Sequence, residues 1–275
     1  ADLERGAITR EEALELLEEL LIKLSYNLFI LPSYAKQTAS ELGGDNCAVT
    51  IGGVDASGED ATNGLSYLFM DAIANIKSMT NSFSIRLHAD SPPEYVKKAA
   101  EVFSKTSGPA IYNDEVIIHA MQRTGCTLKD ARNYGIIGCV EPTSCGNTYG
   151  CTAGNDISLV GILEKVMRNG KLLMMGKRTG RKTGKFEDFA NFQEILDAYR
   201  AQLADSVEFI AKAVNCKDEA YRKNFHNPIV SMLVEGCVER GLDVTQGGAT
   251  YNFGSITARG LATAADSLYA IKMAV

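Results

Sequence analysis

The chain has 275 residues, of which 45% are hydrophobic and 23% are charged, a composition typical of a globular protein with a sizeable core. Its formal net charge of −6 argues against nucleic acid as the main partner, because phosphate binding needs a basic face. No run of about 18 uncharged apolar residues predicts a membrane span, and the N-terminal sequence is acidic and helical rather than a signal peptide. The seven cysteines would leave a disulfide framework with one unpaired thiol, so we expect a reducing cytoplasmic location.

Short apolar runs alternate with amphipathic helices through the first half of the chain, a pattern that favours an α/β fold. Thr9 and Glu12 form a capping box ahead of a first helix. Ser91 is the expected N-cap of a later helix, with Pro92 in the first turn and Glu94 completing the cap. The sequence predicts strands at 47–53, 82–88, 109–114 and 133–138, and further helices at 61–78 and 115–125.

The second half is predicted to be mostly helical. Helices are expected at 157–170, 191–214, 228–240 and 261–274, with strand and loop at 247–256. The chain begins at the approach to a helix and stops inside a helical pattern, so we expect both ends to be cut from a longer polypeptide.

Residues 136–156, IIGCVEPTSCGNTYGCTAGND, contain three evenly spaced cysteines, Cys139, Cys145 and Cys151. Five residues separate each pair, whereas zinc and iron–sulfur motifs use tighter pairs, and no histidine lies nearby. A metal site is therefore not favoured. The other four cysteines are expected to be small packed side chains: Cys47, Cys126, Cys216 and Cys237.

Cys139 stands where a strand gives way to a loop, and Glu141 follows it two residues later. A thiolate nucleophile needs a base or cation that lowers its pKa, and a carboxylate has the opposite effect. A thiyl radical abstracts a hydrogen atom without becoming charged, so it tolerates the carboxylate. Glu141 could then take a proton from a substrate hydroxyl, whose acidity rises once the adjacent carbon bears the radical. Pro142 restricts Glu141 to an extended conformation, which helps to hold its side chain beside Cys139.

The pentapeptide GCVEP at 138–142 resembles the cysteine loop of the glycyl radical enzymes, within the pyruvate formate-lyase-like superfamily. It is most similar to the lyase branch near glycerol and hydroxyproline dehydratases and choline trimethylamine-lyase. The resemblance covers essentially the whole chain. Further blocks occur in family order: GGVDASGEDATN (52–63), SIRLH (84–88), AIYNDEVI (110–117), DARNYGIIGCVEP (130–142), GCVERGLDVTQGGATYN (236–252) and ADSLYAIK (265–272).

The resemblance implies an α/β fold that is part of a ten-stranded barrel, built from two five-stranded half-barrels with surrounding helices. Residues 1–275 would be the central part of the catalytic domain, with the N-terminal region and the C-terminal glycine-radical domain absent. A separate S-adenosylmethionine-dependent iron–sulfur activase would install the radical on a glycine outside this chain. The chain itself would bind no cofactor or metal and would be inactive alone. The implied partners are that activase, a small-molecule substrate and a second copy in a full-length homodimer.

Carried over residue by residue, the resemblance makes Cys139 the thiyl and Glu141 the general base. Val140 follows Cys139 where pyruvate formate-lyase has paired cysteines, so formate chemistry is disfavoured. Familiar dehydratases have an aromatic residue where this chain has Asn46, and bulky or acidic groups where it reads TAGND, which leaves the substrate open. The candidate substrate-binding residues are Ser40, Asp45, Asn46, Asn155, Asp156 and Asn252.

The expected activity is an elimination in a small polar substrate, of the dehydratase or C–N lyase type. Radical decarboxylation of an arylacetate-like acid is an alternative, because the predicted pocket departs from the dehydratase pattern. A non-catalytic barrel fragment that acts only as a scaffold is an alternative from a different class.

Overall fold

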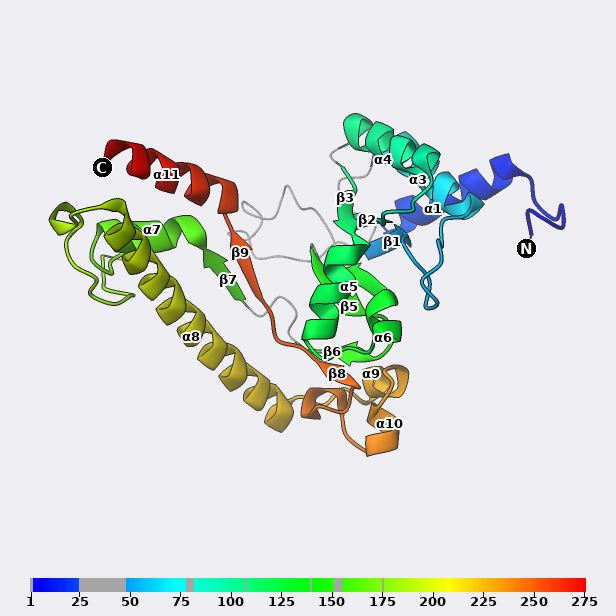
Figure 1. Ribbon diagram of the computed structural model, residues 1–275. Helices are drawn as coiled ribbons and strands as arrows, with labels where there is room; N and C mark the ends of the chain where they lie inside the picture. Colours follow the sequence, from blue (N-terminus) through cyan, green and yellow to red (C-terminus); the bar gives the residue numbers. More distant parts are fainter. Residues whose placement is uncertain are drawn as a thin grey trace. The chain divides into compact units, whose positions relative to one another are not determined.

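The structure is a computed structural model that describes residues 2–24, 48–77, 82–106, 108–138, 140–150, 155–174 and 176–275. It divides into two compact units, Ala1–Cys145 and Gly146–Val275 (Figure 1). Within the described ranges, no helix is long and apolar enough to cross a membrane.

The first unit is built on a parallel sheet with the strand order β1-β2-β3. Strands and helices alternate along it, so the predicted α/β class is confirmed. Its elements are α1 (Arg10–Leu24), β1 (Ala48–Gly52), α3 (Gly64–Ile76), β2 (Ser82–Leu87), α4 (Pro93–Lys105), β3 (Ala110–Asn113), α5 (Asp114–Arg123), α6 (Leu128–Arg132), β4 (Tyr134–Ile137) and β5 (Glu141–Ser144).

Helices α1, α3 and α4 pack with the sheet around one apolar core (Figure 1). Leu21 of α1, Met70 of α3 and Ile85 of β2 are completely buried. Full burial of a side chain of this size contributes about 1.5–3 kcal/mol. This core holds the parallel strands in place, and β4 is joined to β1 by a hydrogen bond from the Ile136 N–H to Thr50 Oγ1 at 3.0 Å.

One of the two predicted helix caps in this unit is confirmed and the other is wrong. The Glu12 N–H donates to Thr9 Oγ1 at 3.1 Å, and the Thr9 N–H donates to the Glu12 carboxylate at 2.7 Å. Ser91 is not an N-cap, because α4 begins two residues later, after Pro92. The hydroxyl of Ser91 instead accepts the N–H of His88 at 2.9 Å, which closes the turn that follows β2.

The second unit contains two parallel strand pairs, β6–β8 and β7–β9, and the 33-residue helix α8 (Figure 1). Ile162 and Val166 of α7 pack against Ile195 and Tyr199 of α8 to form its main core. Its elements are β6 (Thr148–Tyr149), β7 (Asn155–Ser158), α7 (Leu159–Met167), η1 (Phe186–Asp188), α8 (Phe192–Asn224), α9 (Pro228–Leu233), α10 (Cys237–Arg240), η2 (Val244–Gln246), β8 (Tyr251–Asn252), β9 (Ile256–Arg259) and α11 (Leu261–Ala274).

The predicted helices of this unit are present with changed limits. Helix α8 runs ten residues past the predicted end at 214. The helix expected over 228–240 is two short helices, because Gly236 adopts a φ of +97° between them. The described strands form one three-stranded sheet and three two-stranded pairs, so the ten-stranded barrel stays a prediction.

We expect Met70→Ala to lower the free energy of unfolding by about 2–5 kcal/mol, because it opens a cavity in the core of the first unit. Met174 is 98% exposed, and Met174→Ala should change the same quantity by less than about 0.5 kcal/mol. Urea unfolding followed by circular dichroism measures both. Equal midpoints for the two variants would contradict the placement of Met70.

Candidate active site

Strands β4 and β5 form an antiparallel hairpin, in which Tyr134 pairs with Ser144 and Ile137 pairs with Glu141. Residues 138–140 connect the two strands. Cys139 lies outside the described residues, so its role as the radical carrier stays a prediction. Glu141 is described, and it is the first residue of β5.

The carboxylate of Glu141 turns back over the connection that precedes it. Its Oε2 accepts a hydrogen bond from the backbone N–H of Val140 at 2.9 Å. Gly138 has a φ of +59°, and a Cβ added there would lie 2.7 Å from the same oxygen. The carboxylate is therefore held against the backbone of both residues that flank position 139.

A buried ion pair lies at the other end of the hairpin, where β4 begins. Arg86 of β2 donates from Nε and Nη2 to the two carboxylate oxygens of Asp114 at 2.9 and 2.8 Å. The hydroxyl of Tyr134 donates to Asp114 Oδ1 at 2.7 Å, and the guanidinium carbon lies 3.9 Å from the centre of the Tyr134 ring. Burial, and then the hydrogen bond to Asp114, raise the pKa of Tyr134, which therefore stays a proton donor.

The sequence patterns did not predict this cluster. Arg86, Asp114 and Tyr134 each stand inside a family block, but the first two lie 28 positions apart and the last two lie 20 positions apart. The sequence feature that could have indicated the cluster is where these residues stand. Arg86 is near the end of a strand, Asp114 begins a helix and Tyr134 begins a strand. Parallel strands bring their carboxyl ends to the same edge of a sheet, which is where such side chains can meet.

Several predicted substrate-binding residues cannot be compared with the structure. Ser40, Asp45 and Asn46 lie outside the described residues, as does the side chain of Asn155. Asp156 is described: its Oδ2 lies 2.9 Å from Nη2 of Arg259, on the paired strand β9. About half of the Asp156 side chain is exposed, so this pair adds little to stability.

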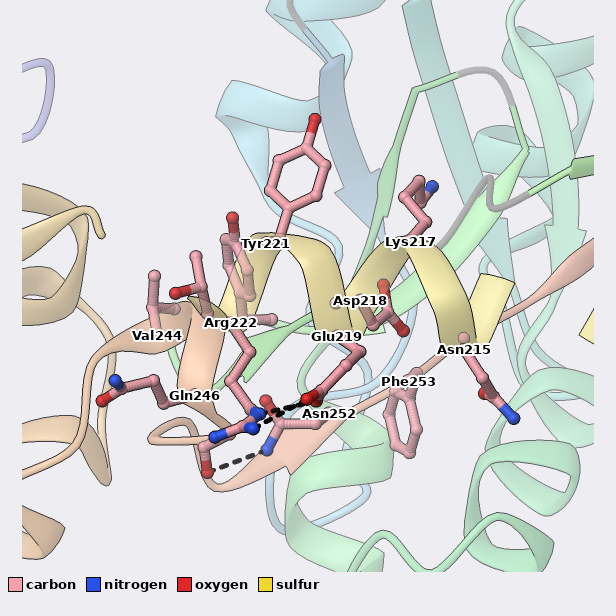
Figure 2. A pocket seen from close by; sticks show the side chains of 15 residues that line it. Asn215, Lys217, Asp218, Glu219, Tyr221, Arg222, Val244, Gln246, Asn252 and Phe253 are labelled. Atoms are coloured by element: carbon pink, nitrogen blue, oxygen red, sulfur yellow. Dashed lines mark hydrogen bonds and ion pairs between the residues drawn. The ribbon is translucent and has the colours of Figure 1, made fainter. Parts of the chain in front are cut away.

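Asn252 lines a pocket of about 470 Å³ between the end of α8, η2 and the β6–β8 pair (Figure 2). Asp156 is not among the residues that line it. The Nδ2 of Asn252 donates to the carbonyl oxygens of Gly247 and Ala249 at 3.3 and 3.0 Å. Part of its hydrogen-bonding capacity therefore holds its own loop. The other lining side chains that matter here are Tyr149, Asp218, Glu219, Tyr221, Arg222 and Phe253.

Glu219 is one of the two acidic residues that line this pocket, and it is paired with cationic side chains (Figure 2). Arg222 donates to both of its oxygens at 2.7 and 2.8 Å, and Nζ of Lys223 lies 3.0 Å away. The hydrogen bonds from Arg222 and Lys223 lower the pKa of Glu219 to about 2. At neutral pH this group is ionised and engaged, so the pocket suits binding of a polar molecule better than proton transfer.

The cysteines in the described part differ in burial. Cys126 and Cys237 are buried, as the sequence predicted. Cys216 is exposed on α8, so the prediction that it packs in a core is wrong. Burial raises the pKa of the Cys126 and Cys237 thiols. Among the described residues, no group of three or more histidine, cysteine or acidic side chains could hold a metal ion.

The family model described as pyruvate formate lyase-like matches residues 1–275, so the chain belongs to that family. The (2S)-3-sulfopropanediol dehydratase of Klebsiella oxytoca is 34% identical over an alignment of 278 positions, which covers 100% of this chain and 33% of that protein. This chain therefore spans about a third of the length of the relatives it matches.

Two solved structures extend the comparison. The B12-independent glycerol dehydratase from Clostridium butyricum, in its glycerol-bound form, matches with a TM-score of 0.86 and 36% identity, covering 98% of this chain and 34% of that one. A glycyl radical enzyme from Archaeoglobus fulgidus matches with a TM-score of 0.85 and 32% identity, covering 99% and 35%. The resemblance to the glycyl radical enzymes is confirmed.

Among Cys126, Cys216 and Cys237, we expect the exposed Cys216 to react first with iodoacetamide. A raised pKa leaves less thiolate at a given pH, so Cys126 and Cys237 should react more slowly and need a higher pH. Peptide mass spectrometry after short pulses between pH 7 and 9 measures the order. Faster labelling of Cys126 or Cys237 than of Cys216 would contradict the burial pattern.

Proposed function

We propose that this chain is the central part of the catalytic domain of a glycyl radical lyase, whose complete form contains a ten-stranded α/β barrel. The observation that carries the proposal is the Glu141 carboxylate, held against the backbone on both sides of position 139. A nearby negative charge disfavours a thiolate but not a neutral sulfur radical. The residues present therefore fit one-electron chemistry at Cys139.

The proposed reaction is an elimination that needs no external oxidant. The sulfur radical of Cys139 takes a hydrogen atom from a hydroxyl-bearing carbon of the substrate, and Glu141 takes the proton of that hydroxyl. The neighbouring C–O bond then breaks, and the departing hydroxyl leaves as water with the proton that Glu141 held. The product radical takes the hydrogen atom back from the thiol, which regenerates the sulfur radical and leaves a carbonyl compound.

The proposed substrate class is a small 1,2-diol. Two of the compared proteins are dehydratases named for glycerol and sulfopropanediol, and this chain matches both over nearly its whole length. For the same reason, elimination is preferred to decarboxylation of an arylacetate-like acid. Ser40, Asp45, Asn46, Asn155, Asp156 and Asn252 remain the proposed substrate-binding residues.

The remaining parts of the proposal concern the whole polypeptide. A glycine outside these 275 residues supplies the radical to Cys139, and an S-adenosylmethionine-dependent iron–sulfur activase installs it. The full-length form acts as a homodimer in the cytoplasm.

In the full-length polypeptide, we expect Cys139→Ala to abolish turnover and Glu141→Gln to lower kcat by about 10²–10⁴-fold. Both variants should still form the glycine radical, because neither change touches the residue that stores it. Electron paramagnetic resonance after activation measures the radical, and product formation from candidate diols measures turnover.

Cys216→Ala is the matched control for the cysteine variant. Cys216 is exposed, and it lies on α8, far along the chain from the β4–β5 hairpin. It should retain wild-type turnover. Full activity in Cys139→Ala or Glu141→Gln would refute the assigned roles.

We expect Gly138→Ala to lower kcat by about 10²-fold, because the new methyl group would displace the Glu141 carboxylate. Gly146→Ala is the matched control: Gly146 also has a positive φ, of +83°, but an added Cβ there meets nothing within 4 Å. Both variants carry backbone strain, so the difference between their kcat values isolates the crowding of Glu141. An equal loss in both would show that strain alone is responsible.

A further inference from the structure

The guanidinium of Arg86 joins four separate segments of the first unit. Besides Asp114, it donates from Nη1 to the carbonyl oxygen of Tyr134 at 3.1 Å. Its Nη2 donates to the carbonyl oxygens of Arg132 at 3.0 Å and Val54 at 3.3 Å. These acceptors belong to the segment after β1, the end of α6 and the start of β4, so one side chain fixes their relative positions.

The carboxylate of Asp114 completes the set of directional bonds. It accepts from Arg86, from the Tyr134 hydroxyl and from the backbone N–H of Val54 at 2.8 Å. The side chains of Arg86 and Asp114 are only 7% and 1% exposed. A Cβ added to Gly53 would lie 2.4 Å from Arg86 Nε, so the backbone after β1 packs directly on the guanidinium.

Stability alone does not explain such a cluster. A buried ion pair is weak evidence for stability, because desolvation offsets the attraction and well-packed apolar side chains often serve as well. Planar, bidentate bonds from arginine instead fix the geometry of the groups they join. The groups joined here are the C-terminal end of the parallel β1-β2-β3 sheet and Tyr134, the first residue of the strand β4 that leads to position 139.

Small errors at Tyr134 would be carried along the hairpin. Ile137 lies three positions after Tyr134, which is about 10 Å along the strand. A tilt of about 6° at Tyr134 would therefore move the far end of β4 by about 1 Å, a displacement that can cost about 10²-fold in rate. Beyond the cluster, β4 is joined to β1 by the neutral hydrogen bond between Ile136 and Thr50.

We infer that Arg86, Asp114 and Tyr134 act together as positioning residues, which hold the β4–β5 hairpin so that Glu141 and the residue at position 139 are presented correctly. This inference rests on the proposed function, since it assumes that both groups react. None of the three residues is assigned a contact with the substrate.

The test uses transfer of a hydrogen atom between the radical glycine and Cys139 in the full-length polypeptide. The hydrogen on the glycine α-carbon splits the electron paramagnetic resonance signal into a doublet. In D₂O the thiol carries deuterium, which moves to the glycine carbon as the radical moves to sulfur. When sulfur then takes back the original hydrogen, deuterium stays on the glycine and the doublet collapses. The rate of collapse reports the position of the hairpin without any substrate.

We expect Tyr134→Phe to slow the collapse by about 10-fold and Arg86→Lys by about 10²-fold, with the radical yield unchanged. Tyr134→Phe removes one hydroxyl and keeps the ring, so this variant can still test the inference if Arg86→Lys fails to fold. Tyr95→Phe is the matched control, because the buried Tyr95 hydroxyl has no hydrogen-bond partner among the described residues. The doublet of this variant should collapse at the wild-type rate.

Hydrogen exchange of the backbone amides at 134–144 provides a second measurement that needs no radical. Arg86→Lys should speed exchange there at least about 10-fold and leave residues 93–105 of α4 unchanged. Wild-type collapse rates in both variants would overturn the inference while the proposed function stands. Absence of a radical in the activated wild-type protein would overturn the proposed function, and unchanged hairpin exchange in Arg86→Lys would then overturn this inference as well.

Discussion

The carboxylate of Glu141 lies against the backbone on both sides of position 139, and a negative charge there opposes the formation of a second charge nearby. Sulfur chemistry that passes through a thiolate is therefore disfavoured at this hairpin. Chemistry that moves a hydrogen atom is not, because the sulfur stays neutral throughout. The proposed role of the same carboxylate is to take the proton that a radical at a neighbouring carbon makes acidic. One electrostatic constraint thus supports the proposed division of the two roles between residues two positions apart.

Local features of the fold followed from the sequence because few residues decide them. The capping box at Thr9 depends on two side chains and the start of one helix, and it is present as predicted. Ser91 showed the same capping pattern, with a glutamate three residues later. Because Pro92 and Pro93 follow it, the helix begins later, and the Ser91 hydroxyl closes a turn instead. The break at Gly236 was missed because the helical spacing of apolar residues continues across it. The left-handed backbone of Gly236 nevertheless ends one helix before the next begins.

The roles of Cys139 and Glu141 stay predictions, and the buried cluster that supports their hairpin was not predicted. Glu141 was identified from its distance to a cysteine along the chain and from the proline behind it. The bonds among Arg86, Asp114 and Tyr134 join residues that the sheet topology alone brings together, so no spacing rule could find them. Cys216 was wrongly predicted to be buried, because cysteine usually is. It lies on the exposed side of the long helix α8.

The two units offer different chemistry. In the second unit, Glu219 in the pocket is ionised and bound by Arg222 and Lys223, and Asp156 has Arg259 beside it. In the first unit, the charged pair is buried and binds backbone carbonyl groups, which are the same for any side chain. Besides the Asp114 carboxylate and the Tyr134 ring, the Arg86 guanidinium binds these backbone groups, so the cluster is suited to holding the hairpin rather than to recognising a substrate. The proposed substrate-binding residues are therefore other side chains, namely Ser40, Asp45, Asn46, Asn155, Asp156 and Asn252.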